Sequence, residues 1–238
     1  MAVAKKQLPA LSKPEASKKT TPAKAPAEKA VAPAEAERLT IFRLNRETIR
    51  VRVKGMSPLL VHRFSEKSKR IMLESMQGRK NPKEPKNPEE EYRAAAYRFP
   101  DGGFGFPAIG VKAAMVSAGR FYKGVTMVAL RQALFVDGEL GNDNQKLIRI
   151  IGDDPIMRED VVRVGMSGTD LRYRPQWTEW AADIEITFFT GMLDRSAVLS
   201  LLDAAGTGVG IGEWRPERSG DNGTFAVDSD VDVTIIGQ

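Results

Sequence analysis

The chain has 238 residues, 42% of them hydrophobic and 28% charged, with a formal net charge of +5, one histidine and no cysteine. These figures exclude a disulfide scaffold, a thiolate metal site and a histidine-rich metal site, and they suit a folded domain with a sizeable core. The sequence contains neither an apolar run of about 18 residues nor an apolar signal segment, so we expect a cytoplasmic protein without a membrane partner.

Most of the positive charge belongs to the N-terminal segment. Residues 1–38 hold eight of the 36 basic and four of the 31 acidic residues, which is +4 of the +5. Their Ala, Pro, Lys and Glu content cannot bury enough apolar surface to offset the entropy of ordering. We predict a disordered basic tail over 1–38, either associated with nucleic acid or merely solubilising, and one α+β domain over 39–238.

The first predicted strand covers 49–54 and alternates apolar with basic residues. One face should enter a core, and the other carries Arg50, Arg52 and Lys54. Three like charges repel one another, and a bound anion would relieve that repulsion. The alternatives are a solvated face, an edge-protecting face, or pairing with acidic residues further along the chain, namely Asp153, Asp154, Glu159 and Asp160.

Two helices and a loop should follow this strand. Ser65 is a suitable N-cap for a helix over about 66–77, and Pro88 suits the start of a helix over 89–97. The proline-broken, charged stretch 78–88 between them is typical of a mobile loop.

An aromatic turn and a helix come next. Residues 99–107 predict a turn that exposes Phe104 and Phe106 as possible subunit contacts. A helix over about 108–122 should follow, with four residues able to face a core: Ile109, Ala113, Met115 and Val116.

The remaining pattern is rich in strands. Residues 133–136 and 146–151 are joined by a polar, glycine-containing segment, which predicts a β-hairpin. Further predicted elements are strands at 161–164, 170–174 and 180–189, a helix at 195–205 capped by Asp194, and strands at 225–227 and 231–236. Reduced to its core, the order is strand, helix, hairpin, helix, strand, which is the ferredoxin-like or RNA-recognition-motif topology with insertions.

A glycine-rich segment, 206–212, follows the last predicted helix and precedes a strand. Phosphate-binding Rossmann and Walker loops have the opposite order, with the glycines between a strand and a helix N-terminus. The sequence therefore predicts no nucleotide cofactor, and we expect no cofactor of another kind.

Arginines and aromatic residues occur together in two places, 171–177 and 210–218. Arginine binds phosphate bidentately, aromatic rings stack on unpaired bases, and glycines allow close backbone approach. With the basic strand, these segments predict a single-stranded nucleic-acid site made of Arg50, Arg52, Lys54, Arg63, Arg172, Tyr173, Arg174, Trp177, Gly210, Gly212, Trp214, Arg215 and Arg218. Alternatively, Tyr173 and Trp177 belong to the core, and Trp214 in its polar loop is the better candidate for exposure.

Two resemblances bear on this prediction. The segments Gly55-Met-Ser-Pro58-Leu-Leu60, Gly206-Thr-Gly-Val-Gly-Ile-Gly212 and Gly223-Thr-Phe225 resemble the RAMP superfamily, the RNA-recognition-motif proteins of CRISPR effector complexes. That resemblance implies RNA binding through the glycine-rich loop and the adjoining sheet, and side-by-side assembly along the nucleic acid. The segments 97–107 and 157–160 resemble uncharacterised proteins of tailed bacteriophages, which implies a location in the bacterial host cytoplasm.

Catalysis has thinner support. His62 is a candidate general base for RNA cleavage, because the RAMP resemblance includes RNA-cleaving members with a histidine; a lone histidine is more often structural. The acidic residues at 153–154 and 159–160 are a candidate Mg²⁺ site or simply a cap and turn. We expect no catalytic or metal-binding residue.

A further alternative to nucleic-acid binding and to catalysis is a structural function. The chain would then be an assembly or virion subunit without affinity for nucleic acid.

Overall fold

The computed structural model describes residues 43–79, 85–165 and 168–237, which belong to one compact unit. The predicted tail at 1–38 and the centre of the predicted loop at 78–88 lie outside the described residues. The described chain mixes helices with antiparallel strands, as predicted. The helices are α1 (Glu66–Met76), α2 (Pro88–Ala94), α3 (Ala108–Ala118), α4 (Met127–Ala133) and α5 (Arg195–Gly208), with 3-10 turns at Gly119–Phe121 and Pro216–Arg218.

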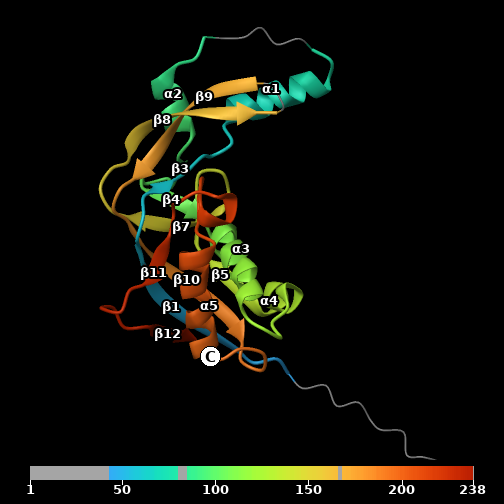
Figure 1. Cartoon of the computed structure of the whole chain (residues 1–238), viewed down its shortest axis with the longest axis vertical. Helices are drawn as coiled ribbons and strands as arrows, with labels where there is room; N and C mark the ends of the chain where they lie inside the picture. The colour runs from blue at the N-terminus through green and yellow to red at the C-terminus, as the bar shows by residue number, and fades with distance from the viewer. Residues whose placement is uncertain (1–42, 80–84, 166–167, 238) are drawn as a thin grey trace, which may run out of the picture. The chain divides into compact units, whose positions relative to one another are not determined.

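The strands form two sheets (Figure 1). They are β1 (Arg46–Gly55), β2 (Leu59–Leu60), β3 (Tyr97–Arg98), β4 (Phe104–Pro107), β5 (Leu134–Asp137), β6 (Glu139–Leu140), β7 (Lys146–Ile151), β8 (Ile156–Val164), β9 (Gly168–Trp177), β10 (Ala181–Phe189), β11 (Phe225–Val227) and β12 (Thr234–Gly237). The larger sheet has the order β11-β1-β10-β7-β4-β3, with β12 on β1, β5 on β10 and β6 on β7. The smaller sheet has the order β2-β9-β8.

The centre of the larger sheet is the long antiparallel pair of β1 and β10, in register from Arg46 opposite Phe189 to Lys54 opposite Ala181. β11 and β12 lie along the other edge of β1, and β5 and β7 along the other edge of β10. In chain order, α3 falls between β1 and β5, and α5 falls between β10 and β11.

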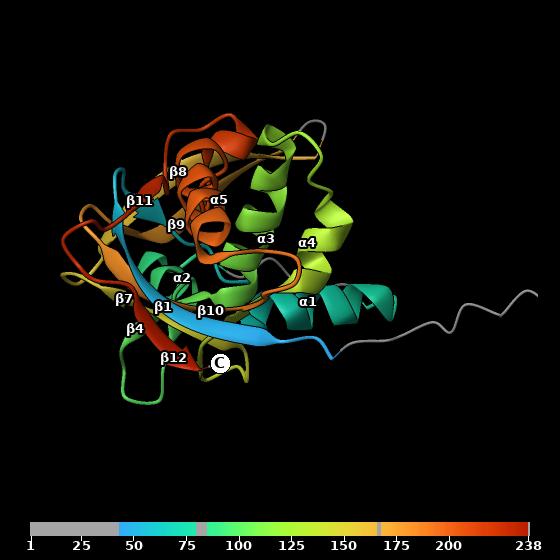
Figure 2. The ribbon, with the colours of Figure 1, turned by 90° about the horizontal axis from the view of Figure 1, so that it is seen from below.

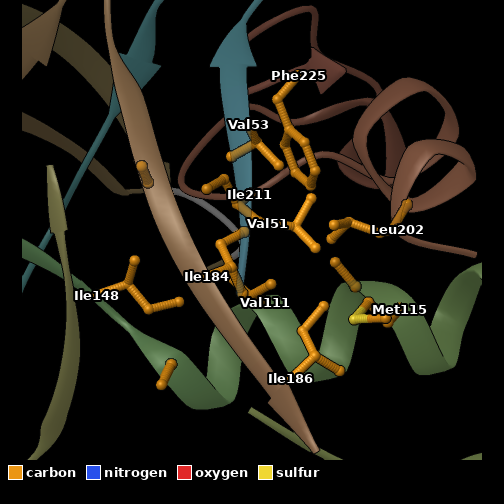
Figure 3. Close-up of a cluster of buried hydrophobic side chains, with 14 of the residues drawn as sticks. Val51, Val53, Val111, Met115, Ile148, Ile184, Ile186, Leu202, Ile211 and Phe225 are labelled. Carbon is orange, nitrogen blue, oxygen red and sulfur yellow. The ribbon is translucent and has the colours of Figure 1, made fainter. Parts of the chain in front are cut away.

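Helices α3 and α5 cover one face of this sheet and lie side by side (Figure 2). Strict alternation in β1 sends Ile49, Val51 and Val53 into the core beneath them. Figure 3 shows Val51 pointing toward Leu202 of α5, and Val53 lying beside Phe225 of β11. Burying these side chains is the main stabilising contribution, at about 1.5–3 kcal/mol for each fully buried one.

The predicted helix starts are confirmed. The Ser65 hydroxyl accepts from the Ser68 backbone N–H at 3.2 Å, and the Asp194 carboxylate accepts from the Ala197 N–H at 2.7 Å. Asn87 caps α2, with Pro88 in its first turn. Each cap satisfies an amide that the helix itself leaves without a partner.

Three expectations about packing are wrong. β5 pairs with β10 instead of forming a hairpin with β7, whose hairpin partner is β6. The segment after Phe99 is strand β4, and Phe104 packs edge-on against Trp177, at 5.4 Å between ring centroids, instead of lying exposed. In α3, Ile109 and Ala113 are exposed, because the face toward α5 and the sheet is formed by other residues, among them Val111 and Met115.

Candidate nucleic-acid interface

A groove of about 530 Å³ lies where the smaller sheet meets α1, α2 and the loop after α5. We call it the β9 groove. Its charged walls come from four segments distant in the chain, and they consist of Arg63, Lys67, Lys86, Glu90, Glu91, Asp170, Arg172 and Glu213, with His62 and Tyr173 beside them. Of the predicted binding residues, the groove brings together Arg63, Arg172 and Tyr173.

The segment predicted to interleave arginines with aromatic residues is strand β9, whose alternation separates the two kinds. Arg172 and Arg174 stand opposite Asp160 and Arg158 of β8 on one face, and Tyr173 stands opposite Glu159 on the other. Trp177, on the face of Tyr173, is only 2% exposed against Phe104. The prediction that Trp177 stacks on a base is therefore wrong, and its alternative, a core residue, is correct.

Arg174 is also corrected, because its side chain is 1% exposed and reaches no solvent. Its guanidinium donates to Asp160 at 2.6 Å and lies 3.5 Å from Glu213 of the glycine-rich loop. One atom, Nε, is buried without a hydrogen-bond partner among the described residues. Arg174 therefore ties the smaller sheet to the loop.

His62 faces Arg172 across the groove, with 3.4 Å between Nδ1 and the guanidinium. A guanidinium only donates, so Nδ1 accepts and the ring is neutral with its proton on Nε2. Burial lowers the pKa of His62, and the positive charge of Arg172 lowers it further. Two effects therefore keep His62 uncharged at neutral pH.

Arg63 leads from β2 into α1 and is held from two sides. Its guanidinium donates to both carboxylate oxygens of Asp143 and lies 3.3 Å from Glu66. Across the groove, Lys86 pairs with Asp170 and lies 3.8 Å from Glu91. Arg63 and Lys86 thus already have acidic partners, and so does Arg172, which lies 3.6 Å from Asp170.

The glycine-rich loop, residues 209–223, is pinned to the neighbouring strands. The Glu213 N–H donates to the Leu60 carbonyl at 2.8 Å, and the Ile211 N–H to the Gly223 carbonyl at 2.9 Å. Gly212 has φ +79°, and a Cβ there would lie 2.4 Å from the Leu60 oxygen. Gly210 likewise has φ +72° and faces Pro216. Gly212 therefore lets the loop approach β2, and Gly210 lets the loop pack against itself. Close approach of a nucleic acid at these glycines stays a prediction.

This rigid loop displays Trp214. Its side chain is 46% exposed, and its backbone has the left-handed φ of +56°. That conformation costs a non-glycine residue of order 1–2 kcal/mol, and it persists where the surroundings enforce it. Here the Trp214 carbonyl accepts from the Asn222 N–H at 3.0 Å. Trp214 directly follows Glu213, which lines the groove.

The two loop arginines differ from each other. Arg215 donates to the Gly212 carbonyl at 3.1 Å and to Glu217 at 2.9 Å, so it braces the loop from within. A hydrogen bond from Ser117 lowers the pKa of Glu217, and Arg215 lowers it further. Arg218 is exposed and forms no ion pair within the described part of the chain.

The basic face of β1 lies outside the groove. Arg50 pairs with Glu185, and Arg52 donates to both oxygens of Asp183 at 2.7 Å, each partner directly opposite on β10. The expected repulsion between Arg50 and Arg52 is thus relieved by Glu185 and Asp183 of β10, and not by the acidic residues at 153–160. Lys54 is exposed, with no ion pair among the residues described.

The acidic residues considered for Mg²⁺ do not converge. Asp160 binds Arg174 and Arg158, whereas Asp153 and Asp154 are exposed. Among residues 43–79, 85–165 and 168–237, no cluster of three or more acidic, histidine or cysteine side chains is placed to hold a metal. Within those same ranges, no helix is long and apolar enough to cross a bilayer.

Sequence reasoning missed Lys67, Lys86 and Glu213 as groove residues. Lys67 and Lys86 lie just inside α1 and just before α2, in segments that are polar throughout. No local sequence signal shows that the starts of two helices face the same strand. The positions of Lys67 and Lys86 in the groove therefore follow only from the three-dimensional structure.

The comparisons with known proteins are sparse. No family model matches the chain, and no curated protein matches it. One solved structure that it resembles is the cryo-EM structure of a Type III-B Cmr-β complex bound to cognate target RNA, with 9% identity and a TM-score of 0.45. The likeness covers 81% of this chain and 61% of that one. A likeness of this extent supports neither a shared activity nor a shared ligand.

Proposed function

We propose that this chain binds single-stranded nucleic acid without chemistry, using the β9 groove and Trp214. The observation that carries the proposal is the exposed indole of Trp214, held in a strained backbone by a hydrogen-bonded loop. Because hydrogen bonds already fix the backbone at Trp214, a flat partner can stack on the indole without the entropy cost of ordering the loop. Aromatic stacking contributes about 1–3 kcal/mol per base.

The charges in the groove favour contact with bases over contact with phosphates. Its walls carry four Lys or Arg side chains and four Asp or Glu side chains, so the net charge is zero. A phosphate would have to displace Asp170 from Lys86 or approach the nearby carboxylates. Nucleobases present both donors and acceptors, which suits walls of mixed charge. In this arrangement, exposed cations without an acidic partner, such as Arg218, would contact the phosphates.

We infer a ferredoxin-like core of the RAMP kind from the strand order of the larger sheet. β1, β5, β10 and β11, with α3 and α5 as the intervening helices, follow the strand–helix–strand–strand–helix–strand pattern. The smaller sheet, α1 and α2 are insertions in this scheme. A phage source, a location in the host cytoplasm and assembly of several copies along the nucleic acid complete the proposal.

The test is fluorescence anisotropy of the full chain with short labelled poly-dT and poly-U. Trp214→Ala should weaken binding by about 5- to 150-fold, which is the loss of one stacked base. Phe135→Ala is the matched control, because Phe135 is 44% exposed in β5 away from the groove. Absence of binding by the unmodified chain to either oligonucleotide would refute the proposal. The remaining hypothesis would then be an assembly subunit that does not bind nucleic acid. Light scattering tests that hypothesis, because the mass of such an assembly should not change when an oligonucleotide is added.

One observation favours a second candidate, a metal-independent RNase. His62 lies in the β9 groove, and its lowered pKa favours the neutral ring, which is the form that can accept a proton as a general base. Cleavage of a single-stranded RNA that is lost in His62→Ala and retained in Trp214→Ala would support catalysis. Binding without cleavage would rule it out.

A further inference from the structure

The outer edge of β8 is an open strand edge. Of the strands that the structure describes, only β9 pairs with β8, in continuous register from Ile156 opposite Gln176 to Val164 opposite Gly168. β8 contains no proline, bulge or lysine, and the protection of its edge rests on four charged residues of both signs among its nine. Four of its five apolar residues are exposed, above all Val161 at 69%, and Val162 is partly buried.

The charges of β8 are complementary to a second copy of the same strand. Glu159 and Arg163 lie two residues before and two residues after Val161, on the same face. We propose that two copies of this chain pair antiparallel along β8, with Val161 on the two-fold axis. Each Glu159 then faces the other copy's Arg163, on both sides of a central Val161 pair. This inference goes beyond the proposed function and does not depend on it.

The alternative registers are less favourable. A two-fold axis at Glu159, Asp160 or Arg163 would place that residue opposite its own copy, and directly opposed like charges destabilise a sheet. An axis at Val162 sets Arg163 against Val161 and leaves Glu159 without a charged partner. The sequence of β8 therefore selects the register centred on Val161.

This register joins two three-stranded sheets into one continuous sheet. A two-fold axis perpendicular to a sheet keeps each face on the same side. Arg172 of both copies therefore lies on one face, with the two β9 strands about 14 Å apart at the usual strand spacing. This contact is closed, so by itself it joins two copies and no more, and assembly of further copies along a nucleic acid would use another surface.

Light scattering on the full chain provides the first test. We expect twice the 26.2 kDa mass of one chain at micromolar concentration. Glu159→Arg alone and Arg163→Glu alone should each give monomers, and the double charge swap should restore the dimer. Arg131→Glu, an exposed change in α4, is the control and should stay dimeric. A monomeric parent chain, or a double swap that stays monomeric while folded, would overturn the proposal.

The absence of cysteine permits a test of register. Val161→Cys should crosslink to its own copy on mild oxidation, because directly opposite residues on paired strands lie within disulfide range. Glu159→Cys alone should not crosslink, whereas a mixture of Glu159→Cys and Arg163→Cys chains should. Crosslinking of Glu159→Cys to itself would show a different register. Since no oligonucleotide is present in either test, failure here leaves the proposed nucleic-acid binding untouched.

Discussion

Two strands carry the same short pattern, Arg50-Val-Arg52 in β1 and Arg172-Tyr-Arg174 in β9, and the fold uses them differently. In β1 both arginines pair with acidic residues directly opposite on β10, at the solvent-exposed face of the larger sheet. In β9 one arginine lines a groove beside His62, and the other is buried under the glycine-rich loop. Alternation sets which face a side chain occupies, but the neighbouring elements decide whether it is neutralised, displayed or buried.

The largest expected difference between the two strands is in stability. Asp160→Asn leaves Arg174 buried without its closest negative partner, and breaking a buried pair in this way costs about 3–5 kcal/mol of unfolding free energy. Asp183→Asn makes the same change beside Arg52 at a partly exposed position and should cost under about 1 kcal/mol. Urea denaturation measures both. Equal losses of unfolding free energy in the two variants would show that burial does not make the ion pair of β9 more important for stability than that of β1.

The next difference is in binding. Arg172→Ala removes a groove side chain and should weaken binding to poly-dT or poly-U about tenfold, as expected for a hydrogen bond to a charged group. Arg50→Ala should leave affinity nearly unchanged, because Arg50 lies outside the groove and pairs with Glu185. Anisotropy titrations of the two variants compare them directly. A greater loss of affinity in Arg50→Ala than in Arg172→Ala would show that the interface lies on the larger sheet.

A pH dependence that begins near pH 6.5 should follow the β9 pattern. The pKa of His62 is lowered in the folded state, so the unfolded chain binds the proton more readily. The stability contribution of His62 is therefore present above the unfolded pKa of about 6.5 and is lost as pH falls below it. Denaturation at a series of pH values should show this decline, and His62→Gln should reduce it. A decline unchanged in His62→Gln would assign the effect to other groups.

The smallest expected effect is the coupling between Arg50 and Glu185. Exposed ion pairs contribute little to stability, and salt screens them. A double-mutant cycle with alanine at both positions, in low and high salt, measures the coupling energy. A larger coupling that persists in high salt would mean that the β1 face resembles the buried pair of β9 after all.

Local patterns predicted the elements, and only long-range pairing decided the site. Alternation located β1, and cap residues located the starts of α1, α2 and α5. The pairing of β5 with β10 joins segments about fifty residues apart, and no local pattern encodes it. The sequence left open whether Trp177 is exposed or buried, because the residue that covers it, Phe104, comes from a distant strand. The exposure of Trp214 was predictable from its polar loop, and its left-handed backbone was not.

The three tryptophans divide into one accessible indole and two enclosed ones. Trp177 and Trp180 are 2% and 4% exposed, against 46% for Trp214. Acrylamide added to the native protein should therefore quench the emission of Trp214 almost alone. The protein thus carries an intrinsic optical probe at the proposed interface, and shielding of that probe by an unlabelled oligonucleotide can be followed without attaching a dye.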